Sequence, residues 1–104
     1  LDIMQAGGEG VISVVSNAAP GAMARLCERA ADGDWANARA EHERLTPWMQ
    51  AAFVESNPIP VKAALAMQGR CADVLRLPLV PLLDEHRATV AAALQAAGVR
   101  EASA

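Results

Sequence analysis

A side-chain amine that could form a Schiff base with a carbonyl compound occurs once in the chain, at Lys62, the only lysine among 104 residues. A lysine that forms a Schiff base must be partly neutral, which requires desolvation or a neighbouring cation. Lys62 follows the turn Pro58-Ile59-Pro60 at the start of a short predicted helix, and lysine is almost never fully buried. We therefore expect a solvated or structural role for Lys62 rather than a catalytic one.

The two histidines do not lie in a pattern that is typical of a metal site. Glu41, His42 and Glu43 are consecutive, and consecutive side chains do not share one face of a helix. No second His or Cys follows His42 at position i+4, and His86 lies far along the chain. Because zinc requires ligands that converge on one point, we predict neither a metal site nor a bound cofactor.

The sulfur and aromatic side chains are also expected to have structural roles. Cys27 and Cys71 are isolated from each other, so the sequence predicts no disulfide framework and favours a reducing cytoplasm. Cys27 lies on an apolar helix face, where a thiol acts as a small core residue. Trp35 and Trp48 could form a ligand platform, but their positions in a helical pattern favour packing anchors. Glu55, beside a proline turn, is expected to brace helices.

The composition excludes several classes of protein. With 9 basic and 12 acidic residues the net charge is −3, and no basic stripe of the kind that binds nucleic acid is present. No apolar run approaches the roughly 18 residues that span a bilayer. No basic and then apolar leader precedes the first element. We therefore expect a cytoplasmic protein that binds neither nucleic acid nor membrane.

Most of the chain is predicted to be helical. Alanine-rich sequence favours helices, and apolar residues recur at intervals of three and four, as on one helix face. The expected helices cover about residues 19–31, 35–55, 60–68 and 85–97, with a helical remnant at residues 1–6. Asn17 and Asp84 are the expected N-caps, and the turn Asp32-Gly33-Asp34 should close one helix and cap the next.

Residues 11–16 break the helical pattern. The run Val-Ile-Ser-Val-Val-Ser is β-branched and almost entirely apolar, which predicts a strand buried on both faces. A single such strand leaves the backbone N–H and C=O groups along both of its edges unpaired, and each such group costs about 1–3 kcal/mol when it is buried. The sequence supplies no second strand, and Leu1 follows no capping residue. We therefore predict a mostly α fold with one β-strand: the last βα unit and the helical domain that end a (β/α)8 barrel.

Three blocks of sequence resemble the dihydrodipicolinate synthase family, in family order and at family spacing. They are Gly7-Gly8-Glu9-Gly10-Val11-Ile12-Ser13-Val14 with Asn17, Phe53-Val54-Glu55-Ser56-Asn57-Pro58-Ile59-Pro60-Val61-Lys62, and Leu75-Arg76-Leu77-Pro78-Leu79-Val80-Pro81-Leu82. The likeness extends to Gly98. It implies that residues 1–31 end the barrel, with strand eight at 11–16 and helix eight at 19–31. Residues 32–104 would then form a C-terminal helical domain.

The resemblance also implies an activity. The family's enzymes are homotetrameric lyases that condense pyruvate with aspartate semialdehyde in lysine (diaminopimelate) biosynthesis, through a Schiff base on a lysine. That lysine, a proton-relay tyrosine and a threonine pair would all precede Leu1, and the present sequence contains no tyrosine. We therefore expect no catalytic residue in this chain, and no activity from the chain alone. The one expected site residue is Ile12, whose counterpart in the family borders pyruvate.

Two other interpretations remain open. The four expected helices after Asn17 could form a non-catalytic interaction domain from a split or truncated gene. Alternatively, the whole protein could be a sibling aldolase, similar to N-acetylneuraminate lyase, that acts on another aldehyde.

Overall fold

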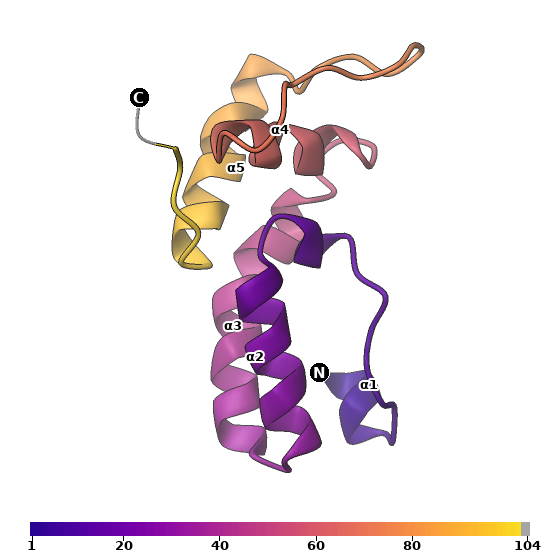
Figure 1. Cartoon of the computed structure of the whole chain (residues 1–104), viewed down its shortest axis with the longest axis vertical. Helices are drawn as coiled ribbons and strands as arrows, with labels where there is room; N and C mark the ends of the chain where they lie inside the picture. The colour runs from indigo at the N-terminus through magenta and orange to yellow at the C-terminus, as the bar shows by residue number, and fades with distance from the viewer. Residues whose placement is uncertain (103–104) are drawn as a thin grey trace.

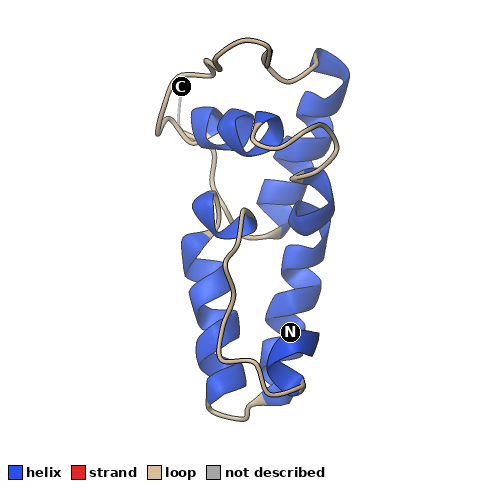
Figure 2. Ribbon diagram, turned by 90° about the vertical axis from the view of Figure 1, so that its right-hand side faces the viewer, coloured by secondary structure: helices blue, strands red, loops and turns tan. Residues whose placement is uncertain are grey.

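The computed structural model describes residues 1–102, and every regular element within that range is a helix (Figures 1 and 2). Their bounds are α1 Asp2–Gln5, the 3₁₀ turn η1 Val15–Asn17, α2 Pro20–Ala31, α3 Trp35–Ala51, α4 Ile59–Met67 and α5 Asp84–Ala96. Helices α2 and α3 lie side by side, and α5 packs on both α3 and α4. No helix of this part of the chain has the length and apolarity needed to cross a membrane.

The strand predicted at residues 11–16 is absent, so the predicted fold class of one β-strand among helices is wrong. Residues 11–13 have no regular structure, and Val15–Asn17 form η1 instead. Ile12 is fully exposed rather than buried on both sides. A strand requires a partner, and none occurs among residues 1–102. Here the Ser16 N–H donates to Ser13 Oγ at 3.1 Å, a local contact that competes with strand pairing.

Helices α2 and α3 are joined by the predicted turn. Gly33 has φ +75°, a conformation that glycine adopts without a steric penalty. Asp34 is the N-cap of α3, and its Oδ1 accepts a hydrogen bond from the Asn37 N–H at 3.4 Å. The prediction that this turn ends one helix and caps the next is confirmed. It holds α2 and α3 antiparallel, with the side chains of Leu26 and Leu45 buried.

The other two predicted N-caps are wrong. Helix α2 starts at Pro20 after Ala19, while the Asn17 side chain donates to the Val14 carbonyl at 3.1 Å. Helix α5 starts at Asp84 itself, so its N-cap is Leu83, whose side chain offers no oxygen. Pro20, the first residue of α2, has no N–H and therefore removes one of the groups that a helix start leaves unpaired.

The core contains one large aromatic side chain, that of Trp48. Its exposed fraction is 0%, and its Nε1–H donates to the Val15 carbonyl at 3.0 Å. Trp48 is therefore a packing anchor, as predicted, and it fixes η1 against α3. Trp35 is 39% exposed at the start of α3, so the same prediction was wrong for Trp35. The predicted division of the chain at residues 31 and 32 into two domains stays a prediction.

Candidate functional site

The segment that carries Ile12 lies between α1 and η1, alongside α2 (Figure 2). Ile12 has a relative exposure of 106%, and its neighbour Val11 is 53% exposed. Within residues 1–102 no hydrogen bond forms on the backbone N–H of Val11, Ile12 or Ser13. The segment thus offers an apolar side chain and free backbone donors to whatever lies against it.

A small apolar cavity of about 80 Å³ lies on the inner side of this segment. Its lining includes Val11 from the segment, Met23 and Cys27 from α2 and Met49 from α3. Cys27 is partly exposed. The side chains of the lining are uncharged, and the free thiol of Cys27 is the reactive group among them.

The end of the segment is fixed from two directions. The Trp48 indole holds the Val15 carbonyl, and the Gln68 amide donates to the Ala18 carbonyl at 3.0 Å. Ser13 and Ser16 bond to each other, since Ser16 Oγ donates to the Ser13 carbonyl at 2.9 Å. The position of Ile12 therefore depends on side chains of α3 and of the end of α4.

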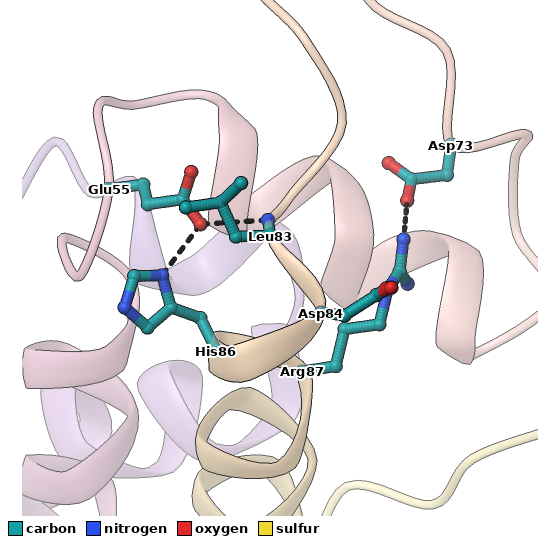
Figure 3. Close-up of polar contacts among 6 residues, drawn as sticks. All are labelled: Glu55, Asp73, Leu83, Asp84, His86 and Arg87. Carbon is teal, nitrogen blue, oxygen red and sulfur yellow. Dashed lines mark hydrogen bonds and ion pairs between the residues drawn. The ribbon is translucent and has the colours of Figure 1, made fainter.

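A second polar cluster joins the turn after α3 to the first turn of α5 (Figure 3). Glu55 Oε2 accepts from the Leu83 N–H at 3.0 Å and lies 2.8 Å from His86 Nδ1. The hydrogen bond with His86 lowers the pKa of Glu55, and the bond from Leu83 acts in the same direction. Glu55 thus supplies the cap that the start of α5 lacks locally, and its predicted bracing role is confirmed.

Arg87 links the first turn of α5 to the loop that precedes this helix. Arg87 Nη2 donates to Asp73 Oδ2 at 2.9 Å, and Arg87 Nε donates to Asp84 Oδ1 at 3.1 Å (Figure 3). The bond to Asp73 is the main reason that the pKa of Arg87 is raised. The spacing of Asp84 and Arg87 was a usable sequence signal, but nothing local indicated Asp73.

The residues considered for other chemistry are separated from one another. Lys62 lines an open groove beside α4. Glu41 pairs with Arg25 at 3.2 Å, whereas His42 Nδ1 is buried without a partner and burial lowers the pKa of His42. Within the described range, no group of three or more His, Cys, Asp or Glu side chains could hold a metal ion.

Comparison with known proteins gives the family. The dihydrodipicolinate synthetase family matches residues 1–97. The chain belongs to this family. A curated 4-hydroxy-tetrahydrodipicolinate synthase of Escherichia coli is 52% identical over 100 residues, which are 95% of this chain and 34% of the relative.

Solved structures of this family have the same fold. A dihydrodipicolinate synthase variant described as the first monomeric one is 45% identical, with a TM-score of 0.92 over 95% of this chain and 33% of that one. The Acinetobacter baumannii synthase, solved in complex with pyruvate, is 38% identical, with a TM-score of 0.89 over 95% of this chain and 34% of that one. The chain therefore spans about a third of the length of the relatives that it matches.

Proposed function

We propose that the chain is the C-terminal third of a lyase that condenses pyruvate with aspartate semialdehyde through a Schiff base, in lysine (diaminopimelate) biosynthesis. The observation that carries the proposal is the 52% identity to a 4-hydroxy-tetrahydrodipicolinate synthase over 95% of the chain. We further propose that the intact protein is a cytoplasmic homotetramer.

In this proposal the covalent chemistry lies outside the chain. The only lysine, Lys62, borders an open groove on α4, far along the chain from Ile12. The chain also has no tyrosine for proton relay. We propose that the Schiff-base lysine, the tyrosine and the threonine pair are supplied by the rest of the protein, so that the isolated chain is inactive.

The proposed contribution of this chain to the site is Ile12, which would border pyruvate. In the intact protein the side chain of Ile12, exposed here, would form an apolar wall of the site, and the N–H groups beside it, unpaired within residues 1–102, could donate to a carboxylate. The pyruvate complex of a relative with this fold supports pyruvate as the ligand.

The test is a chimera in which this chain replaces the last third of the Escherichia coli relative. The chimera should condense pyruvate with aspartate semialdehyde. Ile12→Asp should raise the KM for pyruvate by about tenfold or more, equivalent to roughly 1.4 kcal/mol, whereas the matched variant Ile12→Val should stay close to the parent. A folded chimera that fails to condense the two substrates would contradict the proposal.

A direct test of the assignment of Lys62 uses the chain alone. Incubation with pyruvate and borohydride should leave the mass of the chain unchanged, because no Schiff base forms to be reduced. A stable adduct on Lys62 would contradict the proposal that the reactive lysine lies elsewhere.

The second candidate function is a non-catalytic helical interaction domain. It is favoured by a core that the chain builds without outside help, with Leu45, Trp48, Val90 and Leu94 fully buried. A cooperative melt of the isolated chain, together with a chimera that folds but lacks synthase activity, would support this candidate over the first.

A further inference from the structure

A pocket of about 330 Å³ lies where the start of α2, the end of α4 and the tail after α5 meet. Each of these three segments contributes one arginine to its lining: Arg25, Arg70 and Arg100. No Asp or Glu is among the lining residues that the structure describes, and neither Arg70 nor Arg100 has an ion-pair partner within residues 1–102. The net charge of the chain is −3, so this pocket concentrates positive charge against the overall sign. We name it the arginine pocket.

The guanidinium group of Arg25 is held in place from one side. Arg25 Nε donates to Glu41 Oε1 at 3.2 Å, and the Glu41 side chain is only 8% exposed. The other edge of the group lies over the first turn of α2, with Nη1 3.6 Å from the position that a Cβ atom on Gly21 would take. Within residues 1–102 the contact with Glu41 is the one hydrogen bond of the Arg25 side chain. Glu41 therefore balances the charge of Arg25 and leaves its Nη donors available to a ligand.

The other two arginines are brought to α2 by hydrogen bonds to the backbone. The tail after α5 runs back past the end of α4 (Figure 1), where the Ala102 N–H donates to the carbonyl of the last residue of α4 at 2.9 Å. The Gln68 amide joins the end of α4 to the start of α2, since it donates to the Ala18 carbonyl at 3.0 Å. These contacts place Arg70 and Arg100 in one pocket. Like charges that the backbone holds together repel each other, and a bound anion would relieve that repulsion.

We propose that the arginine pocket binds a small dianionic oxyanion of the phosphate class. Guanidinium groups bind such oxygens through pairs of N–H donors, and three of them converge here with no carboxylate in the lining. The N–H groups of Gly21 and Ala22, unpaired within residues 1–102, add to the positive potential at the start of α2. The arginine pocket shares no lining residue with the cavity beside the Ile12 segment, so this inference goes beyond the proposed function.

The experiment measures the binding of inorganic phosphate to the Escherichia coli chimera by isothermal titration calorimetry. Ionic strength is held constant, and saturating pyruvate keeps phosphate out of the site that we propose for pyruvate. Arg70→Gln and Arg100→Gln each remove one positive charge from the arginine pocket. Arg44→Gln removes the same charge from an exposed position of α3 outside the pocket, and it is the matched control.

The proposal expects one phosphate for each chimera subunit. Arg70→Gln and Arg100→Gln should each raise the Kd by about tenfold, because each removes charged donors, whereas Arg44→Gln should change it by less than about twofold. Equal weakening by all three variants would overturn the proposal and assign the binding to net charge. Absence of saturable binding to the chimera would also overturn it, whatever the chain alone binds. Neither comparison depends on synthase activity, so an inactive chimera that binds phosphate refutes only the proposed function.

Two further measurements test the chemistry of recognition. Acetate, a monoanion, should bind the chimera at least about tenfold more weakly than phosphate, and equal affinity would overturn the assignment of a dianion. Arg25→Lys keeps the positive charge beside Glu41 but removes the paired Nη donors. It should weaken phosphate binding by about threefold or more, with the melting temperature of the chimera close to that of the parent. Unchanged affinity in Arg25→Lys would overturn the assignment of Arg25 to the site.

Discussion

Replacement of Trp48 by phenylalanine tests the contact on which the fold of this chain depends most clearly. Trp48 is fully buried, and its Nε1–H donates to the Val15 carbonyl at 3.0 Å. Trp48→Phe removes this donor, but the Val15 carbonyl keeps its hydrogen bond from the Ala19 N–H at 3.1 Å, so the substitution loses one hydrogen bond, worth about 0.5–1.5 kcal/mol. The smaller ring leaves a void of roughly 40 Å³, which adds about 1 kcal/mol at about 24 cal/mol per Å³. The expected loss is therefore about 1.5–2.5 kcal/mol.

That loss is large for a chain of this size, because small domains have a free energy of unfolding of about 5–15 kcal/mol. The assay is urea unfolding followed by circular dichroism, which does not depend on the fluorescence of the replaced indole. Trp35→Phe is the matched control, since Trp35 is 39% exposed and should lose no more than about 0.5 kcal/mol. Equal losses for the two variants would refute the reasoning from burial and hydrogen bonding.

Three further substitutions test the cap of α5, the turn between α2 and α3 and the interior of α2. Glu55→Gln should destabilise the chain at pH 7. Folding lowers the pKa of Glu55 below its ordinary value of 4.5, mainly through the hydrogen bond with His86. The ionised carboxylate therefore stabilises the fold above pH 4.5, and this stabilisation is lost as the pH falls through the lowered pKa. Thermal melts between pH 7 and pH 3 should show the wild type and Glu55→Gln converging in acid, and a constant difference would contradict the role of the carboxylate. Gly33→Ala should cost about 1 kcal/mol, since Gly33 has φ +75°. Gly21→Ala, inside α2 with only an ordinary contact at 3.6 Å, should instead stabilise the chain slightly in the same urea titration.

The helices are close to what the sequence predicts, because the signals that define them are local. The helix expected at 19–31 is Pro20–Ala31, and that expected at 85–97 is Asp84–Ala96. Glycines with positive φ follow four of the helices, at Gly7, Gly33, Gly69 and Gly98. The largest difference is the end of α3 at Ala51 instead of residue 55, where successive i to i+3 hydrogen bonds replace the helix.

The errors concern features that depend on residues distant in the sequence. A β-branched run at residues 11–16 satisfies the local pattern of a strand, but strand formation requires a neighbour that residues 1–102 do not provide. Asp84 has the right residue type for a cap, yet the cap of α5 comes from Glu55, 28 residues before Leu83. Likewise, no local pattern pairs Asp73 with Arg87, although this pair joins the loop between α4 and α5 to the first turn of α5.

The Ile12 segment and the helices after it are coupled by the same hydrogen bond that Trp48→Phe removes. Val15 follows Ile12 by three residues, so loss of the bond that ties the Val15 carbonyl to α3 should loosen the segment that we propose borders pyruvate, even though the local bond from the Ala19 N–H remains. Trp48 would then be a positioning residue that affects the substrate without touching it. In the chimera, Trp48→Phe should therefore raise the KM for pyruvate more than it lowers kcat, whereas Trp35→Phe should change neither. If the factor by which KM rises equals the factor by which kcat falls, the helices contribute only stability, and the rest of the subunit sets the position of Ile12.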